Sequence, residues 1–194
     1  TSEAVTVNWA VEGTGDNAAS ADDFVATSGT LSFAAGELTK QLTIHSKADN
    51  TVEEDEQFKV VVSKDGVNFP VTEVEGFLLN DDTGILVQAV TNTVQEDSGT
   101  VSFEISRTGP TTESLDVNYS VTGSGKSPIE TNDLTTQVPH NGSVTFAAGE
   151  STKTVTLNIN DDSLVEQAEA IQMKISNTSG VRVLGETATV TLND

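Results

Sequence analysis

Carboxylates crowd one short stretch of the chain, residues 158–169, which reads NINDDSLVEQAE. Four of them fall within nine positions: Asp161, Asp162, Glu166 and Glu169. Two like charges about 5 Å apart repel each other by about 3 kcal/mol at an effective dielectric constant of about 20. A bound cation would remove that repulsion, so the spacing of these acids indicates a metal site.

Calcium is the cation that this donor set suits best. It takes about six to eight oxygen ligands at roughly 2.3–2.6 Å in an adaptable geometry, whereas magnesium requires a strict octahedron and keeps its water ligands. Transition metals favour histidine and cysteine. The chain has no cysteine, and its two histidines, His45 and His140, are isolated and expected on the surface. The spacing is not that of an EF-hand, which alternates Asp or Asn and has glycine at its sixth position.

The composition argues against several classes of function. The chain has 9 Lys and Arg against 30 Asp and Glu, a formal net charge of −21, so no nucleic acid is expected as a partner. No apolar run approaches the roughly 18 residues of a membrane-spanning helix, so no membrane insertion is expected. An enzyme is not expected, because no P-loop, nucleophile elbow or zinc-binding helix motif is present. A glycosidase with paired carboxylates is disfavoured because aromatic residues make up only 5% of the chain.

The sequence contains two copies of one unit, with the same stretches in the same order. The matches are TLSFAAGELTKQLTI (30–44) with SVTFAAGESTKTVTL (143–157), VNWAVEGTG (7–15) with VNYSVTGSG (117–125), and LLNDD (78–82) with TLND (191–194). The first match has an offset of 113 positions and the second an offset of 110, so the second copy holds three extra residues between 125 and 143. An internal repeat of this length indicates tandem domains, with predicted bounds of 1–83 and 84–194.

Both copies have the residue pattern of antiparallel β-structure. Apolar residues alternate in TVTLNI, SVTF and VSFEI, and the FAAGE stretch is expected to be a turn between two such runs. Asn141-Gly142 is expected to form a hairpin turn. Trp9 and Tyr119 occupy matching places and are interpreted as core aromatics.

Residues 163–175 also fit a helix, because Leu164, Ala168, Ile171 and Ile175 fall at helical spacing. The matching stretch of the first copy favours a strand, because its apolar residues alternate strictly from Phe58 onward. We therefore expect an acidic loop followed by a strand in both copies.

The first copy lacks a counterpart to residues 85–116, which read as two further strands of the second copy. These opening strands are expected either upstream in a longer parent chain or from another molecule, because an unpaired sheet edge promotes association. The first residue is Thr rather than Met, and we expect the chain to be a processed product or a piece of a longer protein.

The GTLSFAAGELTKQLTI stretch, followed by an acidic loop, EEDEQFKVVVS and a closing LLNDD, resembles the Calx-β repeat. The second unit matches over its whole length, and the first matches from about residue 4 to residue 82. The resemblance implies an all-β fold of tandem immunoglobulin-like antiparallel β-sandwiches, the first lacking its opening strands. It also implies that acidic loops meet at one end of each sandwich and bind calcium in some members.

The resemblance assigns metal ligands by position in each unit. In the second unit, the expected ligands are Glu96, Asp133, Asp161, Asp162, Glu166, Glu169 and Asp194. In the first unit, they are Asp23, Asp49, Glu53, Glu56, Asp81 and Asp82. The first unit has no counterpart to Glu96, and Ala48 stands in the place of Asp161, so its site is expected to be weaker or absent.

The expected function is a calcium-binding structural or adhesion module, with tandem repeats rigidified by Ca²⁺ at the domain tips. We expect it in a larger extracellular or cell-surface bacterial protein, next to neighbouring repeats of that parent chain. One alternative is a calcium-sensing regulatory pair of domains, which micromolar rather than millimolar affinity would indicate. Another is a spacer that binds no metal, whose first unit is completed by strand exchange in a homo-oligomer.

Overall fold

The computed structural model describes residues 3–64, 73–130, 132–135, 138–176 and 180–194. Within these residues the regular structure is β-strand apart from two short 3-10 helices, so the predicted all-β class is confirmed. The chain forms two compact units: Thr1–Asp49 with Glu53–Asn80 is the first unit, and Asn50–Val52 with Asp81–Asp194 is the second unit. None of the helices in the described part of the chain has the length and apolar character needed to cross a bilayer.

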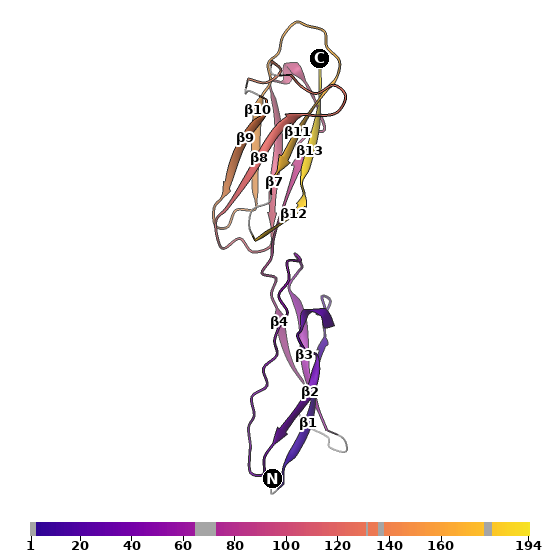
Figure 1. Ribbon diagram of the computed structural model, residues 1–194, viewed down its shortest axis with the longest axis vertical. Helices are drawn as coiled ribbons and strands as arrows, with labels where there is room; N and C mark the ends of the chain where they lie inside the picture. Colours follow the sequence, from indigo (N-terminus) through magenta and orange to yellow (C-terminus); the bar gives the residue numbers. More distant parts are fainter. Residues whose placement is uncertain (1–2, 65–72, 131, 136–137, 177–179) are drawn as a thin grey trace. The chain divides into compact units, whose positions relative to one another are not determined.

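The second unit is a sandwich of two sheets (Figure 1). Its strands are β5 (Thr83–Ala89), β6 (Thr93–Gln95), β7 (Thr100–Thr108), β8 (Leu115–Gly123), β9 (His140–Phe146), β10 (Thr152–Asn158), β11 (Glu169–Ile175), β12 (Val181–Gly185) and β13 (Thr187–Asn193). One sheet has the order β10-β7-β5-β12, and the other has the order β6-β13-β11-β8-β9. Most neighbours are antiparallel, but β12 with β5 and β13 with β6 are parallel.

Period-two alternation builds the core of the second unit. In β7, Phe103 and Ile105 are fully buried, and in β11, Met173 and Ile175 are fully buried, while the residues between them retain contact with solvent. Successive side chains of a strand point to opposite faces, so each sheet turns one apolar face inward. Residues 163–168 form no helix, and β11 begins at Glu169, so the prediction of an acidic loop followed by a strand is confirmed here.

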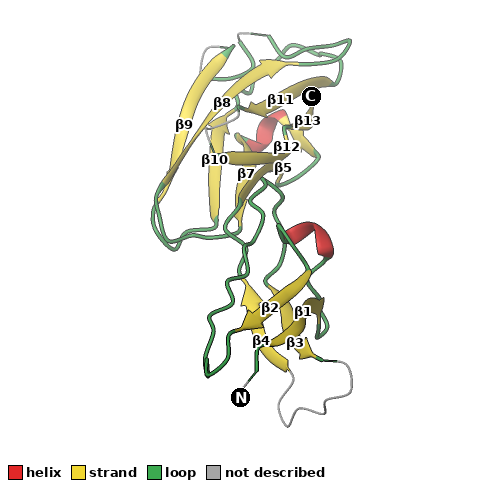
Figure 2. Ribbon diagram, turned by 60° about the horizontal axis from the view of Figure 1, so that its bottom comes forward, coloured by secondary structure: helices red, strands yellow, loops and turns green. Residues whose placement is uncertain are grey.

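The first unit has a single described sheet with the order β2-β1-β3-β4 (Figure 2). Its elements are β1 (Val5–Gly13), the 3-10 helix η1 (Ala21–Asp23), β2 (Ser28–Phe33), β3 (Glu56–Ser63) and β4 (Glu73–Leu78). These strands correspond to β8, β9, β11 and β13, because Trp9 pairs with Gly29 as Tyr119 pairs with Gly142. Within the described residues, nothing in the first unit corresponds to β5 or β7.

Residues 38–44 correct the sequence interpretation of the first unit. Their counterpart, residues 151–157, lies almost entirely in β10, which pairs with β7. The pattern LTKQLTI was expected to be a strand, but residues 37–45 are loop in the structure (Figure 2). A strand needs a neighbour for its backbone N–H and C=O groups, and the described part of the first unit provides no counterpart to β7.

The FAAGE turn is the same in both units and has a local cause. Gly36 and Gly149 have φ values of 83° and 86°, a conformation that glycine adopts without steric cost. Glu37 accepts a hydrogen bond from the backbone N–H of Ala34 at 2.8 Å, and Glu150 does the same for Ala147 at 2.7 Å. The predicted turn is therefore confirmed in both copies.

The Asn141-Gly142 pair does not form the predicted hairpin turn. Both residues lie inside β9, and Gly142 faces Tyr119 on β8. A Cβ atom at Gly142 would overlap the Tyr119 ring, and one at Gly29 would lie 2.8 Å from atoms of the Trp9 ring. These glycines make room for an aromatic side chain that packs against the core.

We expect Gly142→Ala to lower the free energy of unfolding of the second unit by about 1–3 kcal/mol, because overpacking displaces the Tyr119 ring. Urea denaturation followed by far-ultraviolet circular dichroism measures the change. Ser143→Ala, at the exposed neighbouring position, is the matched control. The second variant Tyr119→Val should make Gly142→Ala nearly neutral, and a full loss of stability in that background would contradict the steric explanation.

Candidate metal centre

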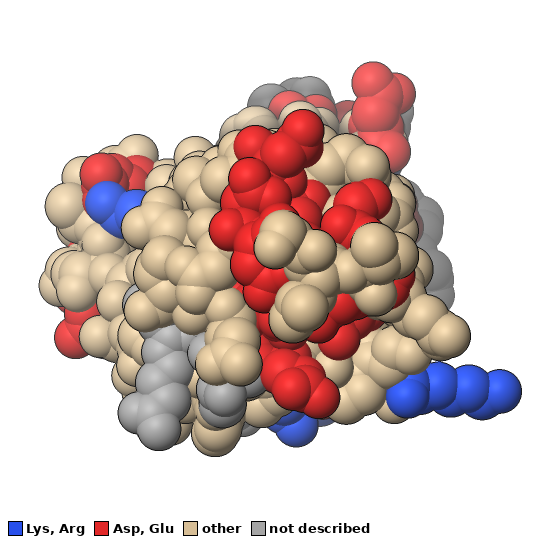
Figure 3. Space-filling model, turned by 90° about the horizontal axis from the view of Figure 1, so that it is seen from above, with Lys and Arg blue, Asp and Glu red and all other residues tan. Residues whose placement is uncertain are grey.

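Four segments of the second unit meet at the end of the sandwich where β6, β10 and β13 end and β11 begins. The loop after β10, the 3-10 helix η2 (Glu96–Ser98) and the C-terminus lie together there (Figure 1). The fourth segment is the loop that contains Asp133, which is hydrogen-bonded to the loop after β10. Acidic side chains form a band across this end of the second unit (Figure 3). Backbone pairing positions the carboxylates, because each of them lies at the end of a strand or in the adjoining loop.

Hydrogen bonds tie these segments to one another. The N–H of Ile159 donates to the carbonyl of Gly99 at 3.0 Å, and the N–H of Asn160 donates to the carbonyl of Asp133 at 2.9 Å. The Gln95 side chain donates to the carbonyl of Asp194 at 3.4 Å. Separating these segments would break the hydrogen bonds between them.

Asp133, Glu166 and Glu169 form the closest group. One oxygen from each lies within 4.8 Å of the other two. Asp133 is 6% exposed, and one of its oxygens accepts a hydrogen bond from the backbone N–H of Glu130. All three residues are among the ligands that the resemblance to the Calx-β repeat implied: Asp133 lies in the loop between β8 and β9, and Glu166 and Glu169 lie in and at the end of the acidic loop.

Glu96 and Asp133 are the two most deeply buried acidic residues of the second unit. Glu96 is 6% exposed and opens η2 directly after β6. Burial raises the pKa of its carboxyl, and so do the charges of Asp162, Glu166, Asp194 and Asp161. The pairing of β6 with β13 and the hydrogen bond from Gln95 to Asp194 bring this residue next to the chain end.

The remaining predicted acids of the second unit lie around this group. Asp194 accepts a hydrogen bond from the backbone N–H of Glu166 at 3.3 Å. Asp162 accepts one from the N–H of Leu164 at 2.6 Å, which shapes the acidic loop. The charge of Asp161 acts on Glu96. The structure therefore brings all seven predicted residues of the second unit to one end of the sandwich.

Crowding raises the pKa of Glu169 from its ordinary value of 4.5 to about 7. Burial is the largest cause, followed by a hydrogen bond and charge repulsion from Asp133, and then by the charges of Glu166 and Glu130. Loss of water contact and the charges of Asp133 and other acids likewise raise the pKa of Glu166. Every charged side chain that causes these shifts is itself a carboxylate.

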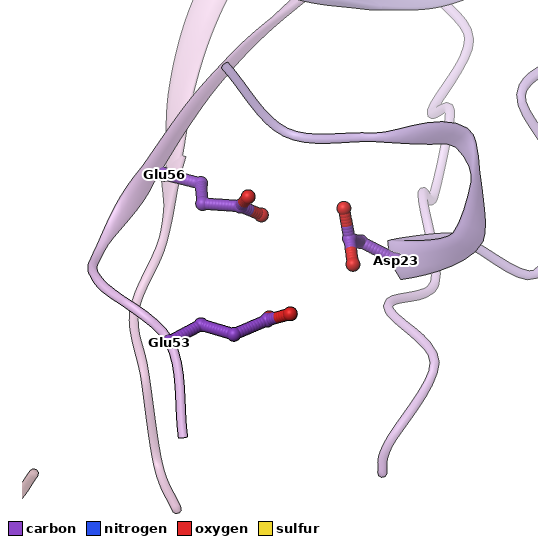
Figure 4. A group of neighbouring side chains, drawn as sticks. All are labelled: Asp23, Glu53 and Glu56. Carbon is purple, nitrogen blue, oxygen red and sulfur yellow. The ribbon is translucent and has the colours of Figure 1, made fainter. Parts of the chain in front are cut away.

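The first unit has an equivalent group formed by Asp23, Glu53 and Glu56. They come from η1, the loop before β3 and the first residue of β3, and their carboxylates point toward one another (Figure 4). One oxygen of each lies within 4.8 Å of the other two. Asp23 also accepts a hydrogen bond from the N–H of Ser20 at 2.6 Å, as Asp133 does from Glu130.

The carboxylate of Glu56 is not fully satisfied by hydrogen bonds. Its Oε2 atom is buried and has no hydrogen-bond partner among the described residues. Burial raises the pKa of Glu56, followed by the charges of Asp23 and Glu53. A buried carboxylate oxygen without a donor is costly, and a cation between the three side chains would satisfy it.

The strand register changes one predicted equivalence. The sequence match aligns Asp81 with Asp194. In the structure, however, Leu78 pairs with Glu56 as Leu192 pairs with Glu169. The residue equivalent to Asp194 is therefore Asn80. Its side-chain oxygen accepts from the N–H of Glu53 at 3.4 Å, as Asp194 accepts from Glu166.

Sequence reasoning missed two residues of these sites, Asn80 and Glu130. An amide oxygen drew no attention in a search for acids, although amide oxygens are ordinary calcium ligands. Glu130 lies outside every acidic run, but its backbone N–H donates to Asp133 and its charge raises the pKa of Glu166 and Glu169. Asp49, Asp81 and Asp82 are not members of the closest group that the described residues form in the first unit, and their role stays a prediction.

The donor chemistry of both groups fits calcium. The residues provide carboxylate oxygens from separate loops, and calcium accepts such ligands in six- to eight-fold coordination of variable geometry. The described part of each group contains no histidine, which zinc or copper would favour. In the second unit, Glu96, Asp133, Glu166 and Glu169 would hold the ion, which would supply the positive charge that the cluster lacks.

We expect the metal-free chain to lose stability between about pH 5 and pH 7.5. The pKa of Glu169 is higher in the folded chain than its ordinary value, so the folded state binds the proton more tightly. The resulting stabilisation is fully present below about pH 4.5 and disappears as the pH rises through about 7. Urea denaturation in a chelator, at several pH values, measures the free energy of unfolding.

Glu169→Gln should flatten this pH dependence, because the amide does not titrate. Glu113→Gln removes the same charge from the loop between β7 and β8, at the other end of β7, and should leave the slope unchanged. Stability that rises with pH over this range in the unsubstituted chain would contradict the expectation.

Comparison with known proteins identifies the family. A family model described as the Calx-beta domain matches residues 1–83 and 79–194. Among solved structures, the apo form of the Calx CBD1 domain has 20% sequence identity and a TM-score of 0.49, and the match covers 58% of this chain and 96% of that one. CBD12 from CALX1.2 has 20% identity and a TM-score of 0.47, with 98% of this chain and 88% of that one covered. The calcium binding domain CBD12 of CALX1.1 has 18% identity and a TM-score of 0.45, with 100% and 88% covered. The two family matches together span the sequence and confirm the resemblance seen in its residues: the chain is a tandem pair of Calx-beta domains and belongs to the Calx-beta family.

Proposed function

We propose that the chain is a calcium-binding structural module, in which Ca²⁺ holds together the acidic segments at the end of each unit. The observation that carries this proposal is the group of Asp133, Glu166 and Glu169, whose carboxylate oxygens lie within 4.8 Å of one another. Buried Glu96 adds a fourth carboxylate beside them. Without a cation these charges repel one another, and a cation turns the repulsion into attraction.

The proposal includes a setting outside the cell, next to neighbouring repeats of a longer chain. Its support is the acidic composition without cysteine, together with two copies of one domain in series. Adhesion is part of this proposal only as a consequence of a rigid array. Calcium affinity separates this role from a sensing role, because extracellular modules bind in the millimolar to submillimolar range and sensors bind in the micromolar range.

Calcium should raise the stability of the second unit and bind there more tightly than in the first. At a concentration 100 times the dissociation constant, a ligand of the folded state adds about 2.7 kcal/mol to the free energy of unfolding. Isothermal titration calorimetry and thermal denaturation, with and without calcium, measure the affinity and the stabilisation. Magnesium at the same concentration should have a smaller effect.

Glu169→Gln should weaken the tighter calcium site by roughly tenfold or more, because charge count tunes calcium affinity. Glu113→Gln, which removes an equal charge far along β7 from the site, should bind calcium as the unsubstituted chain does. Equal binding by both variants, or no heat of binding at millimolar calcium, would contradict the proposal.

The first unit should gain affinity when its two neutral positions are made acidic. Ala48→Asp supplies the counterpart of Asp161, and Asn80→Asp supplies the counterpart of Asp194. We expect the double variant to bind calcium more tightly in the first unit, as measured by titration in a Glu169→Gln background, in which the second site is weakened. Unchanged affinity would show that these two positions do not contribute ligands.

A further inference from the structure

Two strands of the second unit, β5 and β13, each have one side that a neighbouring strand covers only in part. On β5, pairing with β12 ends at Leu86, although β5 continues to Ala89. On β13, pairing with β6 begins only at Thr191, although β13 begins at Thr187. The structure describes no other strand on these two sides. Unpaired backbone groups along a strand edge are a template for a further strand.

The backbone of Ala89 directs its polar groups toward the uncovered side of β5. The N–H of Val90 donates to the carbonyl of Ser102 on β7. Alternate residues of an antiparallel strand bond to the same neighbour, so the N–H and C=O of Ala89 point away from β7. Both groups are therefore free to pair with a chain that lies beyond the end of β12.

Thr187 and Thr189 on β13 are arranged in the same way. The carbonyl of Glu186 accepts a hydrogen bond from the N–H of Ile175, at the end of β11. The same alternation then directs the N–H and C=O groups of Thr187 and Thr189 away from β11. Thr191 agrees with this direction, because its N–H donates on the side of β6. The first half of β13 thus presents an edge of two donors and two acceptors.

A hollow of about 410 Å³ lies beside these two stretches. Its floor is apolar and consists of Val87, which is buried, and of Ala89 and Ala188, which pack against the core. Its rim carries exposed amide and hydroxyl side chains, those of Gln88, Asn92, Thr187 and Thr189. None of the described residues that line it is charged. The hollow therefore suits small apolar side chains at its floor and polar groups at its rim.

The uncovered stretches lack the residues that protect a strand edge. Charged side chains and proline are the usual protection, and β10, at an edge of the same sheet as β5, carries Lys153. The uncovered stretches read VQA (87–89) and TAT (187–189) instead. The charge around them is negative, because Glu104 lies opposite Gln88 and the chain has a net charge of −21. A segment with positive charge at its ends is therefore favoured over an acidic one.

We propose that this hollow binds an extended, positively charged peptide segment of a partner protein, which pairs with Thr187 and Thr189 of β13 and continues the line of β6. The segment has small β-branched or alanine residues at its centre and Lys or Arg at its ends. Alternate side chains of a strand lie on one face, so every second one enters the hollow. Backbone pairing provides affinity and the hollow provides specificity. The site goes beyond the proposed function and does not rest on calcium binding.

The probe is the peptide KTVAVTK, acetylated and amidated, titrated into the full isotope-labelled chain in excess calcium and again in chelator. We expect saturable changes of the amide resonances of Ala89, Thr187 and Thr189, and slower hydrogen exchange at the two threonines. The peptide KTVPVTK has the same charge but no central N–H. It should bind roughly fivefold more weakly or worse, the loss that one missing backbone hydrogen bond causes.

Two variants of Thr189 test the pairing from the side of the protein. Thr189→Pro removes an N–H that points away from β11, so the pairing of β13 with β11 keeps its bonds. Thr189→Lys keeps the backbone donor and adds a charge that repels the ends of the peptide. Both variants should bind KTVAVTK more weakly. Thr152→Lys, at an exposed position of β10, is the matched control and should bind it as the unsubstituted chain does.

Circular dichroism checks that each variant is folded, and Thr189→Lys decides the question if Thr189→Pro is not. Equal binding of KTVAVTK and KTVPVTK would overturn the proposal, because charge alone would then hold both peptides. Equal binding by Thr189→Lys and Thr152→Lys would overturn it as well, and so would unchanged resonances at the highest soluble peptide concentration. A stable dimer that excludes the peptide, seen by sedimentation of the chain alone, would assign the edge to a second copy instead. Calcium titration is separate from all of these outcomes, so their failure leaves the proposed function in place.

Discussion

Mutual repulsion between carboxylates is the constraint on which the candidate sites depend. Backbone hydrogen bonds from Ile159 to Gly99 and from Asn160 to Asp133 join the loops at this end of the second unit. These bonds hold Glu96, Glu166 and Glu169 near one another although every charged neighbour that shifts their pKa is also an acid. The fold therefore stores an unfavourable electrostatic energy at one end, and burial of Glu96 prevents water from relieving it. The buried core of the sandwich behind these carboxylates opposes this electrostatic cost.

Most of this architecture could be predicted from the sequence, because the chain contains two copies of one unit. The apolar residues of 163–175 fit both a helix and a buried strand. The matching stretch of the first copy favours a strand, because its apolar residues alternate from Phe58 onward. Acid positions that recur at a constant offset, such as Glu56 and Glu169, predicted the members of the closest groups in both units. Comparing two copies within one chain separates residues that the fold needs from residues that merely share a composition.

Features that depend on the partner strand were beyond sequence reasoning. The pattern LTKQLTI has the alternation of a strand, but residues 38–44 lie in no strand, because the described part of the first unit holds no counterpart to β7 with which they could pair. The equivalence of Asn80 with Asp194 depends on the register of β3 with β4. The match of LLNDD with TLND differs from this register by one residue, so it aligns Asp81 with Asp194 instead. The exact place of the three-residue insertion also needed the structure. The offset of 110 holds as far as Val25 and Thr135, whose N–H groups donate to His45 and Asn158. The offset reaches 113 at Gly29 and Gly142, so the insertion lies beyond the site.

The parallel pairing of β6 with β13 has a mechanical consequence. Thr93, Val94 and Gln95, near the start of the second unit, are bonded to Thr191, Leu192 and Asn193 at its end. Tension applied between the two ends of the unit acts along these strands, so their hydrogen bonds bear the load together in shear instead of breaking one after another. The Gln95 side chain extends this connection to the last residue of the chain. A domain connected in this way resists extension at the very end where its carboxylates gather.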